Sequence, residues 1–233
     1  MQGLLKEKIV LVTGANGGLG RNVTQAMLDA GATVAGIARK IQDSDFQSSA
    51  FTGLSAEIST AAGAQAAVDA VVSRFGRIDI LAHTVGGFAG GQSIADTGDA
   101  TYQRMMDLNL HCTFYLLRAA LPVMRKTPNG RIVAIGSRAA VEPGAGVGAY
   151  SASKAAMVSL IRTVAQENKD VGMTANVILP GTMDTPANRA AMPNADIGKW
   201  VQPVNVASLI LWLAGDAGKD VNGAVIPVYG SDV

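Results

Sequence analysis

The sequence predicts an α/β fold in which one doubly wound, parallel sheet of about seven strands is covered by helices on both faces. Short runs that are apolar on both faces alternate along the chain with helical segments of a dozen or more residues, and such strands belong to parallel sheets that are buried on both sides. Right-handed crossovers then place helices on both faces. No internal repeat, linker or low-complexity tract divides the 233 residues, so we expect a single domain.

Four strands and two helices are expected in the first half of the chain. The strands are short and apolar, whereas the helical segments carry apolar residues at intervals of three and four. A glycine ends each helix, at Gly31 and at Gly76. The expected strands span residues 8–14, 32–38, 54–59 (the weakest of them) and 77–87, and the helices span residues 20–31 and 61–76.

The second half of the chain alternates in the same way. A long helix is expected over about 99–126, followed by strand 130–137, helix 149–169, strand 174–180, helix 204–214 and strand 224–229. Residues 181–203 lack periodicity and contain Pro186, Pro193 and Pro203, which predicts a loop or short helices. This segment follows a strand, so it is expected at the carboxyl edge of the sheet, where ligands bind in Rossmann-like folds.

Composition limits the partners and the compartment. The 19 lysines and arginines nearly balance the 18 aspartates and glutamates, so neither nucleic acid nor an anionic membrane is expected as a partner. No apolar run reaches the roughly 18 residues that span a bilayer, and the charged residues Lys6, Glu7 and Lys8 argue against a signal peptide. Cys112 is the single cysteine, which fits a reducing compartment. We therefore expect a cytoplasmic protein.

A glycine-rich stretch, TGANGGLG at residues 13–20, lies between the first strand and the first helix. Glycines let the backbone turn tightly and approach a pyrophosphate, whose charge is favoured by the helix N-terminus. A mere tight turn is the alternative, but the position between strand and helix favours a dinucleotide site. The cofactor contacts expected here are Gly14, Asn16, Gly17, Gly18, Leu19 and Gly20.

The end of the second strand indicates which dinucleotide is bound. An acidic residue there would bind the ribose hydroxyls of NAD(H) and repel a 2′-phosphate. The sequence instead has Ala38, Arg39 and Lys40, and cations favour the phosphorylated cofactor. NADP(H) is therefore the preferred cofactor and NAD(H) the alternative, because the two cations can also be a solvated pair at a strand end.

Tyr150 and Lys154 stand four residues apart on one face of the helix expected over 149–169. A free phenol titrates at about pH 10. A neighbouring ammonium favours the phenolate, so Lys154 is expected to lower the pKa of Tyr150 toward the range of an acid-base catalyst. Ser137 ends a strand 13 residues before Tyr150. Its hydroxyl could hold a substrate carbonyl oxygen while the tyrosine donates a proton.

These motifs together resemble the short-chain dehydrogenase/reductase family. The chain has TGxxxGxG after the first strand, Ser137 at the end of a later strand, and YxxxK on the following helix. The resemblance covers nearly the whole chain, and it implies that Tyr150 is the general acid/base, that Ser137 orients the carbonyl, and that Lys154 holds the nicotinamide ribose. Asn109, in MMDLNLHCTF, matches the family's proton-relay asparagine.

The resemblance also implies cofactor contacts on other loops. Glu57 matches an acidic position that contacts adenine, with a surface carboxylate as the alternative, and LPGTMDT (179–185) matches the stretch that lines the nicotinamide. No metal site is expected. The contacts implied beyond the glycine-rich turn are Arg39, Lys40, Glu57, Ile58, Gly86, Tyr150, Lys154, Pro180, Gly181, Thr182 and Thr185.

The fourth strand departs from the family pattern. Where the family has Asn-Asn-Ala-Gly, this sequence has His83, Thr84, Val85 and Gly86. The change removes amides that brace the centre of the sheet in the family. His83 is expected to be a core residue that replaces a structural amide, with a catalytic role as the alternative.

Two stretches, VGGFAGG (85–91) and DTPANRAAMPNADIGKW (184–200), are similar to dihydropteridine reductase, a divergent member of the family. That enzyme works without the family's serine and asparagine, whereas this chain has Ser137 and Asn109. Pterin reduction is therefore an alternative assignment. The expected substrate contacts are Phe88, Arg138, Met183, Asn188, Met192 and Trp200, with Gly87 and Glu142 at the same rim.

The sequence thus predicts an oxidoreductase that transfers a hydride between NADP(H), or NAD(H), and a small-molecule carbonyl or alcohol, with Tyr150 as proton donor or acceptor. A non-catalytic NAD(P)-sensing protein is the alternative, but it should have lost Tyr150 or Lys154 while keeping the glycines. The resemblance implies a homodimer or homotetramer formed through the helices over 99–126 and 149–169. One catalytic domain, residues 1–233, is expected to hold the whole site, with 181–203 as its substrate loop.

Overall fold

The computed structural model describes residues 3–231, and in this range the chain forms the three-layer α/β fold that the sequence predicts. Seven parallel strands form one sheet in the order β3-β2-β1-β4-β5-β6-β7. The strand order reverses between β1 and β4, which is where ligands bind in such sheets. The strands are β1 (Ile9–Thr13), β2 (Thr33–Ala38), β3 (Phe51–Ser55), β4 (Ile80–His83), β5 (Arg131–Ile135), β6 (Thr174–Pro180) and β7 (Val225–Val228).

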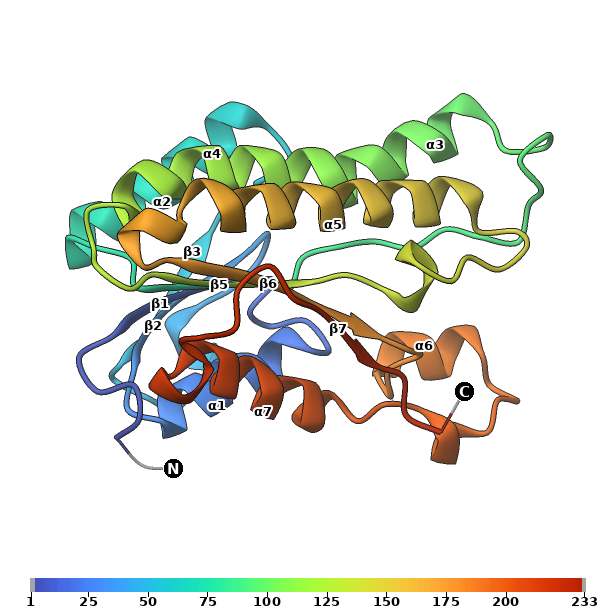
Figure 1. The fold of residues 1–233 in the computed structure, drawn as a ribbon. Coiled ribbons are helices and arrows are strands. Elements are labelled where there is room, and N and C mark those ends of the chain that lie inside the picture. The colour runs from blue at the N-terminus through green and yellow to red at the C-terminus, as the bar shows by residue number, and fades with distance from the viewer. Residues whose placement is uncertain (1–2, 232–233) are drawn as a thin grey trace.

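Helices cover both faces of the sheet (Figure 1). On one face lie α2 (Ala61–Phe75), α4 (Cys112–Met124) and α5 (Gly148–Glu167), and on the other lie α1 (Gly20–Asp29) and α7 (Pro203–Ala214). Helix α3 (Asp99–Met106) leads into α4, and the short α6 (Pro186–Ala191) follows β6. No helix within residues 3–231 combines the length and the apolar character that crossing a bilayer requires.

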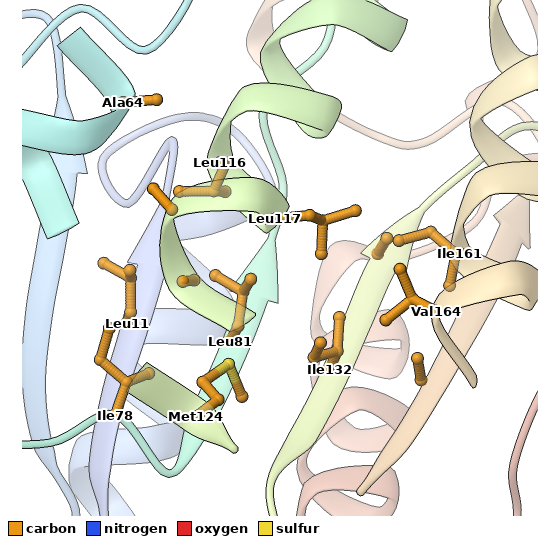
Figure 2. Close-up of a cluster of buried hydrophobic side chains, with 14 of the residues drawn as sticks. Leu11, Ala64, Ile78, Leu81, Leu116, Leu117, Met124, Ile132, Ile161 and Val164 are labelled. Atoms are coloured by element: carbon orange, nitrogen blue, oxygen red, sulfur yellow. The ribbon is translucent and has the colours of Figure 1, made fainter. Parts of the chain in front are cut away.

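The two faces of the sheet bury separate apolar cores. Successive strand residues point to opposite faces, so Leu11 packs under α2 and α4 while Val10 packs toward α1 and α7. Figure 2 shows part of the first core, to which α4 contributes Leu116, β5 contributes Ile132 and α5 contributes Ile161. The two cores hold the strands rigidly, and the loops after their carboxyl ends are free to carry the site.

Beyond shifts of one or two residues at element ends, three predicted elements differ in the structure, and one of them is the strand expected over 77–87, which is limited to Ile80–His83. The third strand was expected at 54–59, which is wrong, because it is Phe51–Ser55 that pairs with β2. Phe51 packs on Phe46 with ring centroids 4.5 Å apart, and it fills the space left by Gly36. The helix expected over 99–126 is interrupted by a π-helical turn at Asp107–His111.

Candidate active site

The glycine-rich turn connects β1 to α1, and its glycines let neighbouring segments approach the backbone closely. Gly14 has a φ of +69°, and a Cβ there would come within 3.0 Å of Thr84 Oγ1. A Cβ at Gly18 would come within 2.9 Å of Thr185 Cγ2, so Thr185 of the loop after β6 lies directly on this turn. The first turn of α1 is Gly-Arg-Asn-Val, without an acidic side chain that would repel a phosphate. The turn therefore fits a pyrophosphate, with Thr185 beside it.

The end of β2 places two cations next to this turn. Arg39 and Lys40 are exposed, and Asn16 Nδ2 donates to the main-chain oxygen of Lys40 at 2.6 Å. The nearby Asp45 carboxylate accepts a hydrogen bond from Gln42 N at 3.1 Å. This bond caps the short 3-10 turn over Asp43–Asp45. The two exposed cations favour a cofactor with a phosphate on its adenosine ribose.

The implied adenine contacts lie on the loop after β3. Glu57 is exposed, and its Oε1 accepts from Ser59 N at 3.2 Å. Ile58 is only 4% exposed and belongs to the core. Ile58 can therefore meet a cofactor only through its backbone.

Ser137, Tyr150 and Lys154 meet at the carboxyl end of β5. Ser137 follows the strand by two residues and makes a side-chain hydrogen bond with Tyr150. Its Oγ also accepts from Ala139 N at 3.2 Å. Lys154 is buried, and its Nζ donates to the main-chain oxygen of Ile135 at 2.9 Å. Helix α5 thus carries a phenol and an ammonium to the same strand end.

The charge states of this group differ from the expectation in one respect. Burial raises the pKa of Tyr150, and the hydrogen bond from Ser137 offsets only part of that shift. Burial also lowers the pKa of Lys154 to about 8. The sequence predicted that Lys154 lowers the pKa of Tyr150. In the structure the pKa is raised instead, because the desolvation of the phenol outweighs the hydrogen bond that lowers the pKa.

Asn109 lies in the π-helical turn between α3 and α4 and is 1% exposed. Its Oδ1 accepts from Gly87 N and its Nδ2 donates to Gly87 O, both at 3.0 Å. Nδ2 also donates to Ser153 Oγ at 3.0 Å. A Cβ at Gly86 would lie 3.0 Å from Asn109 Oδ1 and from Lys154 Nζ. The structure therefore brings Asn109, Gly86 and Lys154 together.

His83 lies in the core. It is 2% exposed, and its ring contacts the hydroxyls of Thr13 and Thr113. Burial and the charge of Lys154 lower the pKa of His83 to about 3, so the ring is neutral. Thr84 Oγ1 donates to Thr13 O at 2.6 Å. These contacts replace the missing amides of the fourth strand, which confirms that His83 is a core residue.

Two of the expected substrate residues flank Tyr150 and Ser137. The Phe88 ring is 62% exposed and meets the Tyr150 ring edge-on, with centroids 4.9 Å apart. Arg138 Nε donates to Glu142 Oε2 at 2.8 Å, and the guanidinium lies over the Tyr229 ring at 4.9 Å. Tyr229 was not predicted from the sequence, because nothing local to it marks contact with a loop 90 residues earlier.

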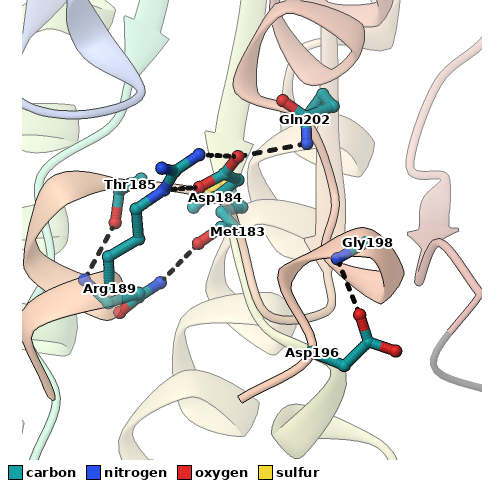
Figure 3. Close-up of polar contacts among 8 residues, drawn as sticks. Met183, Asp184, Thr185, Arg189, Asp196, Gly198 and Gln202 are labelled. Carbon is teal, nitrogen blue, oxygen red and sulfur yellow. Dashed lines mark hydrogen bonds and ion pairs between the residues drawn. The ribbon is translucent and has the colours of Figure 1, made fainter. Parts of the chain in front are cut away.

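The segment 181–203 is fixed by its own polar contacts (Figure 3). Thr185 Oγ1 accepts from Asn188 N, and Asn188 Nδ2 donates to Met183 O at 2.8 Å. Asp184 pairs with Arg189 and Gln202. Of the remaining substrate residues expected here, Met192 is 40% exposed, whereas Trp200 is 8% exposed and presents little surface to a ligand.

Ser153 is a second residue at this site that the sequence did not indicate. Its hydroxyl accepts from Asn109 and donates to the main-chain oxygen of Tyr150 at 2.7 Å. In the sequence it is one of several small residues in GAYSASKAAM. Its spacing of three from Tyr150 was the available signal, since that spacing puts both residues on one helical face.

Comparison with known proteins agrees with this geometry. The family model of the short chain dehydrogenases matches residues 8–196. A short-chain dehydrogenase/reductase of Talaromyces verruculosus is 32% identical, with 97% of each chain covered. A rhamnolipids biosynthesis 3-oxoacyl-[acyl-carrier-protein] reductase of Pseudomonas aeruginosa is 31% identical, with 97% of this chain and 96% of the relative covered. Among solved structures, the Pseudomonas aeruginosa RhlG/NADP active-site complex superposes with a TM-score of 0.91 at 28% identity, covering 99% of this chain and 98% of that one.

Proposed function

Because the chain belongs to the short-chain dehydrogenase/reductase family and is an NAD(P)-dependent oxidoreductase, we propose that it reduces a small-molecule carbonyl with NADP(H) in preference to NAD(H). The observation that carries the proposal is the meeting of Ser137, Tyr150 and Lys154 at the end of β5. The exposed cations Arg39 and Lys40 support the choice of cofactor, as does the NADP in the complex of the Pseudomonas aeruginosa protein.

The chain's own residues would hold the cofactor along the carboxyl edge of the sheet. The backbone from Gly14 to Gly20 receives the pyrophosphate, and Thr185 approaches it from the loop after β6. Gly86 leaves room beside Lys154, whose ammonium would hold the nicotinamide ribose. Pro180, Gly181 and Thr182 follow β6 and line the nicotinamide side in this proposal.

The proton is handled by the side chains at the end of β5. When bound, the nicotinamide supplies or accepts the hydride. The Ser137 hydroxyl binds the substrate carbonyl oxygen, and Tyr150 donates its phenolic proton to that oxygen. Burial raises the pKa of Tyr150, so the phenol keeps its proton at neutral pH, and the hydrogen bond with Ser137 acts in the opposite direction by favouring the phenolate that donation leaves. The positive charge of Lys154 stabilises the phenolate that remains.

The loop over residues 181–203 is proposed to cover the substrate. Phe88 and Met192 offer exposed apolar surface to it, and Arg138, Met183 and Asn188 complete the rim. Trp200 supports the loop from within, because its side chain is buried.

Assembly and location are part of the proposal. We propose a homodimer or homotetramer built on the outer faces of α3, α4 and α5, where Phe114 is 43% and Tyr102 47% exposed. A cytoplasmic location is supported by the single cysteine, Cys112, which is buried and unpaired.

A substrate panel tests the proposal. NADPH oxidation is followed with a simple ketone, a 3-oxoacyl thioester and a quinonoid pterin, and each assay is repeated with NADH. We expect turnover of at least one carbonyl, with the higher kcat/KM for NADPH. NADPH binding without oxidation by any member of the panel would instead support the NAD(P)-sensing alternative, and turnover of the pterin alone would support the dihydropteridine reductase alternative.

A further inference from the structure

His83 lies at the centre of the sheet and is bonded on both sides. It ends β4, directly opposite Thr13 in the register of β1 and β4. Nδ1 lies 2.7 Å from Thr13 Oγ1, and Nε2 lies 2.9 Å from Thr113 Oγ1. All three residues are buried, at 2% exposure or less. The ring therefore joins strand β1 to helix α4 through two buried hydroxyls.

The hydroxyl of Thr113 determines where the proton of the ring sits. It donates its one hydrogen to the main-chain oxygen of Asn109 at 2.7 Å, because a carbonyl can only accept. Toward His83 it can then only accept, so Nε2 carries the proton and Nδ1 accepts from Thr13. In the other tautomer, Nε2 would have no hydrogen and would face the Thr113 oxygen, so two acceptors would lie in contact without a hydrogen between them.

The bonds beyond Thr113 continue in the same direction. Asn109 Nδ2 donates to Ser153 Oγ, and Ser153 Oγ donates to the main-chain oxygen of Tyr150. The bonds from Thr13 through His83 and Thr113 to the Asn109 carbonyl share their hydroxyls and ring, so they polarise one another. Two sets of hydrogen bonds thus meet at Asn109: one runs from Thr13 to its main-chain oxygen, and the other runs from its side-chain amide to the turn of α5 that carries Tyr150.

The π-helical turn explains why the position of Asn109 depends on this support. In this turn Cys112 N bonds to Asp107 O, five residues back, so the regular helical bonds are interrupted around Asn109. The Thr113 hydroxyl supplies the Asn109 carbonyl with a fixed partner. A Cβ added at Gly86 would lie 3.0 Å from both Asn109 Oδ1 and Lys154 Nζ, so these two side chains border the same glycine.

We propose that His83 is a positioning residue: as the neutral Nε2–H tautomer it orients the Thr113 hydroxyl, and so fixes Asn109 between Gly87 and Ser153 beside Lys154. The kinetic consequence rests on the proposed reductase function, whereas the tautomer and the hydrogen bonds do not. The charge that acts on the His83 ring is the ammonium of Lys154. It disfavours a positive charge on the buried ring, so His83 stays neutral.

Two substitutions at Thr113 isolate this connection. Thr113→Val removes the hydroxyl and keeps the shape of the side chain, and Thr113→Ser restores the hydroxyl. Thr174→Val is the matched control. Thr174 is a threonine of β6 that is 5% exposed, and its Oγ1 has no hydrogen-bond partner among the described residues. Tm is measured for every variant, so that assays can be run well below unfolding.

The kinetic readout separates positioning from stability. We expect Thr113→Val to lower kcat about five- to tenfold while the Kd for NADPH stays within about twofold. Thr113→Ser should recover a kcat within about twofold of the wild type, and Thr174→Val should keep the wild-type kcat. A wild-type kcat in Thr113→Val, despite a lowered Tm, would show a purely structural role and overturn the proposal.

A second readout needs no turnover. The chain has two histidines, His83 and His111, so ¹⁵N NMR of the rings resolves them. We expect the Nε2–H form of His83 in the wild type, a tautomer mixture in Thr113→Val, and faster hydrogen exchange of the Asn109 side-chain amide in that variant. An Nδ1–H ring in the wild type, or an unchanged Asn109 amide, overturns the proposal. If the NMR results are as expected but no carbonyl is reduced, it is the proposed function that fails.

Discussion

Lys154 and His83 are both buried basic side chains, yet they change charge in different pH ranges. Burial lowers the pKa of Lys154 to about 8 and that of His83 to about 3. At neutral pH the lysine is therefore charged and the histidine is neutral. The raised pKa of Tyr150 keeps its proton on the phenol under the same conditions. The site thus combines a neutral acid with a nearby cation, which is the state that the proposed carbonyl reduction requires.

The pH dependence of the rate tests the state of Lys154. We expect kcat/KM for NADPH to fall as pH rises through about 8, because the free enzyme then loses the ammonium that holds the ribose and stabilises the phenolate. Initial rates between about pH 6 and pH 10 at constant ionic strength give the profile. Lys154→Met cannot titrate there and should show a low rate without this decline. A flat wild-type profile up to the alkaline limit would contradict the assignment.

The stability of the protein in acid tests the state of His83. Its pKa in the folded state lies below the unfolded value of about 6.5, so the unfolded state binds the proton first as pH falls. The stabilisation is complete above about pH 6.5 and is lost as pH falls toward 3. Between pH 7 and pH 4, the free energy of unfolding should fall about 3 kcal/mol more in the wild type than in His83→Asn. Urea titrations at both pH values measure it, and equal losses would count against a neutral His83.

At the scale of the elements, the local sequence pattern predicted the position of helices and strands that are long or uniformly apolar. Strand β6 has the bounds expected from its sequence, and α5 begins one residue early. The third strand was misplaced because Phe51 is held there by Phe46 and by the space at Gly36, contacts that no local pattern contains. The π-helical turn at Asp107–His111 was missed because its sequence, DLNLH, fits a regular helix.

The contact between the glycine-rich turn and the loop after β6 gives a prediction at this scale. Gly18→Ala would put a Cβ within 2.9 Å of Thr185 Cγ2, so either the turn or the loop must move. We expect the Kd for NADPH to rise about tenfold or more. Isothermal titration measures the Kd. Gly98→Ala is the control, because a Cβ at Gly98 meets nothing within 4 Å.

A double variant identifies the cause. Thr185→Ser removes the methyl group in contact and keeps the hydroxyl that caps α6. Gly18→Ala combined with Thr185→Ser should therefore bind NADPH more tightly than Gly18→Ala alone. If the second substitution recovers nothing, the effect of Gly18→Ala arises within the turn and not from the loop.

At the scale of the whole molecule, the candidate catalytic residues were predictable and their support was not. Ser137, Tyr150 and Lys154 lie within 18 residues of one another, in recognisable motifs. Their neighbours come from distant segments: His83 bonds to a residue 70 positions away, and Asn109 bonds to one 44 positions away. Such contacts depend on strand order and helix packing, which the sequence pattern fixed only in outline.

Binding of the cofactor should stabilise the whole fold. NADPH at about 100 times its Kd should add about 2.7 kcal/mol, which corresponds to a rise in Tm of about 5–10 °C for a chain of this size. We expect a smaller rise with NADH at the same concentration, because Arg39 and Lys40 then have no phosphate to bind. Differential scanning fluorimetry measures both shifts. In Arg39→Ala the two cofactors should give similar shifts, and an unchanged difference would remove Arg39 from the specificity site.

The most direct measurement for the whole account is the kcat of Tyr150→Phe with the carbonyl that the substrate panel identifies. The substitution removes the phenolic oxygen and leaves the ring against Phe88, so NADPH affinity should stay within about twofold while kcat falls by a factor of about 100 or more. Tyr102→Phe, at a 47% exposed tyrosine on α3, should retain the wild-type kcat. A Tyr150→Phe protein that turns over as fast as the wild type would contradict the assignment of Tyr150 as the proton donor.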